Sequence, residues 1–183
     1  MVVLRDAPWP ATILTDRLLL RPIEQADVPV ISRLMTDPSV RKHLGGPVAP
    51  DELAARLAAC VGAATLFSVV RRSDAAAFGL VVIDPETEPD GHAGGDAEVS
   101  YQLLPEFWGH GYGRECVSAA VNWAFQNITP VPPVVIAITQ EANSESRRLL
   151  AAIGMSQVER FMAFDAWQVK YRVDANALAR ATS

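Results

Sequence analysis

Cysteine is scarce in this chain, and long apolar runs are missing. Cys60 and Cys116 are its two cysteines, and each lies within a helical pattern, which excludes a disulfide framework and indicates buried free thiols in a reducing cytosol. The apolar run at residues 1–4 is interrupted by Arg5 and Asp6, so we expect no secretory signal. No run approaches the length of a membrane span. These absences predict a soluble cytoplasmic protein that does not enter a membrane.

The chain also has fewer basic than acidic residues. The formal net charge is −5, which argues against nucleic acid as a direct ligand, because phosphate backbones are bound by lysine and arginine. The negative charge suits a cationic amine as a partner, although solubility alone explains it better. What the chain does have is apolar content. Half of its 183 residues are hydrophobic and 20% are charged, which is typical of one compact globular domain.

Apolar periodicity and breaker residues predict an α+β fold with a mixed sheet. We expect strands at 14–23, 66–71, 78–83, 99–104, 134–139, 157–161 and 167–173. We expect helices at 27–35, 51–61, 114–126 and 144–153, the first of them capped by Asp27. Residues 84–95 contain several prolines and glycines and are expected to form a polar loop.

The segment from Pro105 to Glu115 is the most informative about function. Its glycines alternate at 109, 111 and 113, after the apolar strand 99–104 and before a long helical pattern. A strand, a glycine turn and a helix N-terminus together form an anion site, because backbone N–H groups point outward and the helix dipole adds positive charge. Glycine permits a close approach of the backbone, in part through positive φ. We therefore expect a ligand with phosphate, and specifically pyrophosphate.

Two common phosphate-binding motifs do not fit this loop. A Walker A loop needs Gly-Lys-Ser/Thr, but Gly113 is followed by Arg114 and Glu115, which argues against nucleoside triphosphate chemistry. The dinucleotide motif G-x-G-x-x-G needs a third glycine where this chain has Arg114. Taken alone, the loop is explained equally well as a structural turn that binds nothing.

A second segment resolves this ambiguity. The sequence W-G-x-G-Y-G at 108–113 is followed, after the strand 134–139, by N-x-x-S-x-x-L-L-x-x-x-G at 143–154. This pairing resembles the GNAT N-acetyltransferase superfamily, and most of all the branch that acetylates the N-terminal amines of ribosomal proteins. Residues 15–22 are similar to that branch's first strand and residues 97–101 to its central strand. The resemblance implies an N-terminal extension (1–12), a single acetyltransferase domain (13–173) and a C-terminal tail (174–183).

The resemblance implies acetyl-CoA as cosubstrate, without a metal. In such a fold the fourth and fifth strands run parallel and splay apart, and the pantetheine arm pairs with the fourth strand. Backbone groups near Leu103 and Leu104 would hold pantetheine. Amides of the loop would hold the pyrophosphate: Gly109, His110, Gly111, Tyr112, Gly113 and Arg114. Asn143 would hydrogen-bond the coenzyme arm, although its position also makes it a good N-cap for the following helix. Trp108 stands where many members carry Gln or Arg, but an aromatic residue is usual in this branch.

Acetyl transfer to an amine requires removal of a proton, and Glu98 is our first candidate for the base. Strand alternation places Glu98, Ser100 and Gln102 on one face, and a carboxylate in an apolar cleft acquires a raised pKa. A structural carboxylate is an equally good interpretation on base rates, and Asp165 is a weaker candidate. A backbone N–H between Tyr101 and Leu103 would stabilise the negative charge that develops on the thioester oxygen.

The acid is harder to assign, because Leu150 occupies the position at which many members of the superfamily carry a Tyr acid. Ser146 is the candidate substitute, as proton donor or water ligand, and an ordinary helix-surface serine is the competing interpretation. His43, His92 and His110 show no metal-ligand spacing, so no metal is expected.

The sequence thus predicts an acetyl-CoA-dependent N-acetyltransferase that moves acetyl to a primary amine by direct attack in a ternary complex. A protein N-terminus, an aminoglycoside-like amine and a small-molecule amine remain open as acceptors, and the chain is expected to be a monomer or homodimer. The alternative is a non-catalytic module that binds or senses acyl-CoA.

Overall fold

The structure is a computed structural model that describes residues 9–87, 93–127 and 134–175. These residues form two compact units. The N-terminal unit contains residues 9–82 and 101–117, and the C-terminal unit contains residues 83–87, 93–100, 118–127 and 134–175. Two strands and one helix contribute residues to both units, so the chain passes between them inside regular elements.

The described strands join in one mixed sheet, as the sequence predicts. Its strand order is β1-β2-β3-β4-β5-β6-β8-β7. The strands are β1 Ile13–Leu14, β2 Leu18–Pro22, β3 Leu66–Arg71, β4 Ala76–Thr87, β5 Ala93–Leu103, β6 Val134–Gln140, β7 Ser156–Ala163 and β8 Ala166–Asp174. Strands β5 and β6 pair in parallel through Ala97–Val135 and Glu98–Ile136, whereas β6 and β8 pair antiparallel. The predicted parallel pair is therefore confirmed.

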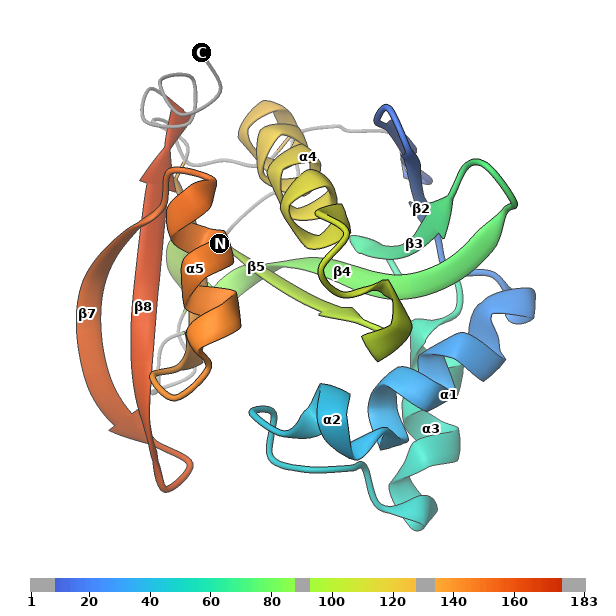
Figure 1. The fold of residues 1–183 in the computed structure, drawn as a ribbon, viewed down its shortest axis with the longest axis horizontal. Helices are drawn as coiled ribbons and strands as arrows, with labels where there is room; N and C mark the ends of the chain where they lie inside the picture. Colours follow the sequence, from blue (N-terminus) through green and yellow to red (C-terminus); the bar gives the residue numbers. More distant parts are fainter. Residues whose placement is uncertain (1–8, 88–92, 128–133, 176–183) are drawn as a thin grey trace. The chain divides into compact units, whose positions relative to one another are not determined.

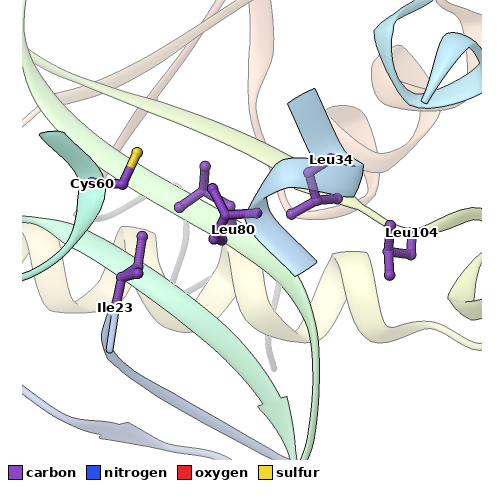
Figure 2. Close-up of a cluster of buried hydrophobic side chains, with 6 residues drawn as sticks. Ile23, Leu34, Cys60, Leu80 and Leu104 are labelled. Carbon is purple, nitrogen blue, oxygen red and sulfur yellow. The ribbon is translucent and has the colours of Figure 1, made fainter. Parts of the chain in front are cut away.

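Three helices belong to the N-terminal unit: α1 Val28–Thr36, α2 Pro38–Arg41 and α3 Pro50–Cys60. Each has proline in its first turn, where the missing N–H costs no helical hydrogen bond. Their apolar side chains pack with those of β4 in a buried cluster, in which Figure 2 shows Leu34, Cys60 and Leu80. Leu34 is fully buried. Burial of this cluster fixes the helices against the sheet.

The C-terminal unit is built around a long hairpin. Strands β7 and β8 form this hairpin, and α5, Ser144–Ala152, packs against β6 and β7 (Figure 1). Leu150 and Ile153 are buried in the core, with exposures of 0% and 2%. Helix α4, Tyr112–Asn127, begins in the N-terminal unit and ends in the C-terminal unit. No helix in the described ranges has both the length and the apolar character required to cross a membrane.

Two predicted elements need correction, and one helix was not predicted. The strand expected at 14–23 is two strands, because Thr15 Oγ1 accepts the Leu18 N–H and bends the chain between them. Strand β4 continues to Thr87 and β5 starts at Ala93, so the predicted loop 84–95 is largely strand; residues 88–92 lie outside the described residues. Helix α2 was missed, and its N-cap Asp37 accepts two backbone N–H groups.

Asp27 does not cap α1 through its side chain, contrary to prediction. Its buried carboxylate accepts hydrogen bonds from both terminal nitrogens of Arg21, at 2.6 and 3.0 Å, and one from the backbone N–H of Glu24 at 2.9 Å. Burial by itself raises the pKa of Asp27, but these hydrogen bonds outweigh it and the pKa is lowered. Asp27 is thus half of an ion pair that ties β2 to the start of the helices.

Candidate functional site

The glycine loop lies between the end of β5 and the start of α4, in the N-terminal unit. After a short 3₁₀ turn at Pro105–Phe107, the chain passes through Gly109 and Gly111, whose φ angles are +76° and +79°. These values lie in the left-handed region, which residues with a Cβ rarely adopt. The positive φ expected for this turn is therefore present.

The N–H groups of this loop remain free to bind a ligand. The first hydrogen bond of α4 runs from the Glu115 N–H to the Gly111 carbonyl, at 3.1 Å. Among the residues that the structure describes, none accepts a hydrogen bond from the N–H groups of residues 109–114. A Cβ added to Gly109 would meet no atom within 4 Å, so the space over the loop is open. Free amides at a helix N-terminus suit a pyrophosphate.

Glu115 holds the loop from the side of the helix. Its carboxylate accepts hydrogen bonds from the Thr15 hydroxyl at 2.5 Å, from the Arg17 backbone N–H at 2.9 Å and from Arg17 Nε at 2.7 Å. Arg17 Nη1 also donates to the His110 carbonyl at 3.0 Å. Burial alone raises the pKa of Glu115, but the hydrogen bonds from Thr15 and Arg17 outweigh it and lower the pKa. The loop is therefore anchored to the turn between β1 and β2.

Trp108 has a structural contact that the sequence did not indicate. Its indole N–H donates to the Leu103 carbonyl at 2.7 Å. The Leu104 N–H donates to the Phe78 carbonyl, and the Leu104 carbonyl accepts from the Phe107 N–H. Several backbone groups expected to hold pantetheine thus have partners within the chain. The Leu103 oxygen keeps a second lone pair for a ligand.

His110 and Arg114 are both exposed. His110 Nδ1 lies 2.7 Å from the Trp108 carbonyl, and its ring stacks on Tyr112 with the ring centroids 5.9 Å apart. The backbone N–H groups of these residues are what the loop offers a ligand, and the His110 side chain packs against neighbours within the loop.

Three arginines that sequence reasoning missed line a pocket of about 470 Å³ next to Tyr112. They are Arg17, Arg71 and Arg72, and they come from the turn before β2, the end of β3 and the turn after β3. No periodicity links these positions to the glycine loop, because their proximity is created by strand pairing. They return below.

The residues proposed for the chemistry lie in the C-terminal unit. Glu98 is partly buried on β5, between the buried Ala97 and Val99. Its neighbours on either side face the core, so Glu98 faces the opposite side of the strand, as alternation predicts. Asp165 is exposed in the β7–β8 turn with a φ of +56°.

Asn143 is the N-cap of α5, as predicted. Its side-chain oxygen accepts the Ser146 N–H at 3.1 Å, which satisfies one of the free donors at the helix start. Ser146 is partly buried in the first turn of α5. The capping role leaves the side-chain NH₂ of Asn143 able to donate to a ligand.

Neither a metal cluster nor a reactive thiol emerges in the described part of the chain. No group of three or more His, Cys, Asp or Glu residues gathers there, and His92 lies outside it. Burial raises the pKa of Cys116 to about 12 and also raises the pKa of Cys60, so both stay protonated.

Comparison with known proteins gives a family match. The model of the acetyltransferase (GNAT) domain family matches residues 17–156. N-acetyltransferase p20 of Bacillus licheniformis, itself uncharacterized, is 28% identical over 127 residues, which are 64% of this chain and 67% of that protein. FsC-acetyl coenzyme A-N(2)-transacetylase of Aspergillus fumigatus is 34% identical over 64 residues, 35% of this chain; the match spans only 26% of that enzyme.

Solved structures share the fold. A GNAT-family acetyltransferase from Bacillus anthracis has a TM-score of 0.76 at 20% identity, over 90% of this chain and 98% of that one. Spermidine N-acetyltransferase from Vibrio cholerae, solved with CoA and spermine, has a TM-score of 0.70 at 16% identity, over 90% of this chain and 99% of that one. The predicted fold class is confirmed.

Proposed function

The chain belongs to the acetyltransferase (GNAT) domain family, and we propose that it transfers acetyl from acetyl-CoA to a primary amine by direct attack in a ternary complex. Membership of this family supports acetyl-CoA-dependent N-acetyl transfer in general. The observation that carries the proposal for this chain is the row of free N–H groups over residues 109–114 at the start of α4. Acetyl-CoA supplies the activated acyl group and a thiolate leaving group.

The loop fits the pyrophosphate of the cosubstrate. Its amides have no partner among the described residues, Gly109 leaves open space above them, and the N-terminus of the 16-residue helix α4 adds partial positive charge. In this proposal the amides of Gly109, His110, Gly111, Tyr112, Gly113 and Arg114 bind the pyrophosphate. The second lone pairs of the Leu103 and Leu104 carbonyls and the Asn143 amide serve the pantetheine arm. Pairing of β5 and β6 at Ala97–Val135 and Glu98–Ile136 provides the parallel pair that this binding mode needs.

Glu98 is the proposed base. It removes the proton that an ammonium acceptor must lose before its nitrogen can attack. Its support is its place on β5, partly buried and on the face opposite the core residues. Ser146 is the proposed proton donor or water ligand, supported by its partly buried position beside Asn143. A thiolate leaves tolerably without an acid, so Ser146 has the smaller role.

The acceptor is proposed to be a protein N-terminus, an aminoglycoside-like amine or a small-molecule amine. The residues at 15–22 and 108–113 favour the branch that acetylates ribosomal-protein N-termini. The spermidine acetyltransferase of Vibrio cholerae favours a small polyamine. The net charge of −5 is compatible with any cationic acceptor. We further propose that the protein acts in the cytoplasm, as a monomer or homodimer, through one acetyltransferase domain at 13–173.

A second candidate function is a non-catalytic module that binds or senses acyl-CoA. One observation favours it: Leu150 is fully buried in the core, at the position where many GNAT members carry a tyrosine acid. A module of this kind would keep the phosphate loop and have no acyl transfer. Glu98 and Ser146 favour the enzyme.

Two parallel measurements distinguish the candidates. Free-thiol release from acetyl-CoA is followed with spermidine, an aminoglycoside and a peptide with a free N-terminus, and the melting temperature is recorded with CoA, NAD or ATP. The enzyme should release thiol with at least one amine, and CoA should stabilise it most, by mass action. Stabilisation by CoA without thiol release would support the sensing module. Stronger stabilisation by NAD than by CoA would reject both.

A further inference from the structure

The pocket beside the glycine loop combines three arginines with the start of α4. Its volume is about 470 Å³, within the range of small-molecule sites. Its lining residues are Asp16, Arg17, Arg71, Arg72, Ser73 and Tyr112. All of them belong to the N-terminal unit. The pocket is therefore defined within one compact part of the molecule.

The three guanidinium groups differ in how their charge is balanced. Arg17 pairs with Glu115 at 2.7 Å, and Arg71 pairs with Asp74. Within the described residues, Arg72 meets no carboxylate; its Nη1 donates to the carbonyls of Thr15 and Asp16, at 2.7 and 3.0 Å. These two carbonyls hold one end of the guanidinium, and its Nε and Nη2 groups remain available to donate to a ligand. Arg72 thus carries the uncompensated positive charge of the pocket.

The other two arginines are oriented by their carboxylate partners, and each keeps N–H donors that these carboxylates do not occupy. A guanidinium has five N–H donors, and Asp74 takes one from Nε and one from Nη2 of Arg71. Both Nη1 hydrogens of Arg71 remain for a ligand or for the Tyr112 hydroxyl. Asp16 is the acid among the lining residues, so the anion is expected to bind on the arginine side of the pocket.

Tyr112 connects this pocket with the phosphate loop. Its backbone N–H belongs to the free row at the start of α4, and its ring lines the pocket. The Arg17 guanidinium lies over that ring, 4.6 Å from its centroid, while Arg17 Nη1 donates to the His110 carbonyl. Tyr112 therefore belongs both to the proposed pyrophosphate site and to the arginine pocket, so the two are adjacent. A ligand with two phosphate positions a few bonds apart can reach both.

We propose that this arginine pocket binds the 3′-phosphate of the coenzyme A nucleotide, with Arg72 as its main charge partner. The ligand chemistry is a phosphate monoester dianion, for which guanidinium groups provide matched pairs of N–H donors. The inference rests on the proposed function, because it is acetyl-CoA that carries a pyrophosphate and a 3′-phosphate on one ribose. The pocket consequently selects CoA over dephospho-CoA.

The test compares the affinities of CoA and dephospho-CoA by calorimetry, in the wild type and in two variants. The wild type should bind CoA about tenfold more tightly, the equivalent of one solvent-exposed charge-assisted contact. Arg72→Gln should reduce this ratio to near one by weakening CoA alone. Ser73→Glu adds negative charge without touching the Arg72 anchor, and should reduce the ratio in the same way. Arg56→Gln, an exposed arginine paired with Glu52 on α3, is the matched control and should keep the wild-type ratio.

Each outcome is decisive. Partial unfolding of a variant weakens both ligands alike and leaves the ratio of the two affinities unchanged. Weaker binding of CoA with unchanged binding of dephospho-CoA in the pocket variants therefore supports the 3′-phosphate site. A wild-type ratio retained in both pocket variants overturns it, and so does equal binding of the two ligands by the wild type. If neither CoA nor dephospho-CoA binds the wild type, the proposed acetyl-CoA-dependent function is wrong, and the 3′-phosphate site falls with it. Inorganic phosphate should compete with CoA more than with dephospho-CoA; phosphate binding that leaves the CoA preference unchanged would reassign the pocket to the free ion.

Discussion

A single methyl group at Gly111 tests whether the glycine loop binds phosphate or is only a turn. Gly111 has a φ of +79°, and a Cβ built there would lie 3.4 Å from Arg17 Nη2, an ordinary contact distance. Gly111→Ala is therefore compatible with the folded chain on steric grounds. Its cost is backbone strain, about 1–2 kcal/mol for an L-residue in the left-handed region. For a chain of this size that lowers the melting temperature by roughly 2–8 °C.

The effect on the ligand should be larger than the effect on the fold. An alanine relieves its strain by rotating toward negative φ, which turns the next peptide N–H, that of Tyr112, away from the row. Each charge-assisted hydrogen bond lost costs about 1.5–3 kcal/mol, so the affinity for CoA should fall roughly 10- to 150-fold. Calorimetric titration with CoA measures this directly, beside a thermal melt of the same sample.

Gly46 provides a matched control. Its φ is +84°, and a Cβ there would meet no atom within 4 Å. Gly46→Ala should carry the same strain and lower the melting temperature by a similar amount, but leave CoA affinity unchanged. If Gly111→Ala melts like Gly46→Ala and still binds CoA like the wild type, the loop is a structural turn and the assignment of pyrophosphate to it is wrong.

Three further predictions concern chemistry, pH and packing. Glu98→Gln should retain CoA affinity but lose about 10²–10⁴-fold in turnover, with residual activity rising with pH; near-full turnover would remove Glu98 as the base. Glu115 has a folded pKa below its usual 4.5, so its stabilisation is present above that pH and is lost as pH falls. The gap in melting temperature between wild type and Glu115→Gln should be widest at pH 7 and close in acid; a constant gap contradicts this. Gly79→Ala should cost about 1–3 kcal/mol in urea unfolding, because its Cβ would overlap Leu103 and come within 3.0 Å of the Gln102 carbonyl; a neutral change would mean that β5 shifts freely.

Elements with a strong local signal were predictable from the sequence. The run at 134–139 is almost entirely apolar, as a strand buried on both faces requires, and β6 is buried over its first four residues. The Asn143 cap followed from one residue type at a helix start. The strand at 14–23 was predicted wrongly because its break carries no Gly or Pro, and Asp16 alone is a weak turn signal. The turn depends instead on the Thr15 hydroxyl, which is held by Glu115 100 residues later in the chain.

The same distinction applies to the candidate site. The glycine loop is local, so its anion-binding character was readable from residues 105–115. The arginine pocket is not, because Arg17, Arg71 and Arg72 are brought together by the pairing of β2 with β3, in which Leu18 lies opposite Arg71. Composition gave no hint of it: a chain with a net charge of −5 concentrates three arginines at one small surface. Charge counted over a whole sequence therefore says little about a single binding site.

The network behind the loop also has a consequence for binding energy. Thr15 and Arg17 hold Glu115 on the side of α4, and Arg17 holds the His110 carbonyl, so the loop's shape is set by contacts that no ligand supplies. A loop fixed in this way spends little conformational entropy when a pyrophosphate binds. The arrangement differs from a flexible glycine turn, in which ordering would consume part of the interaction energy. Anchoring by Glu115 thus allows a loop containing three glycines to present its N–H groups in one fixed direction.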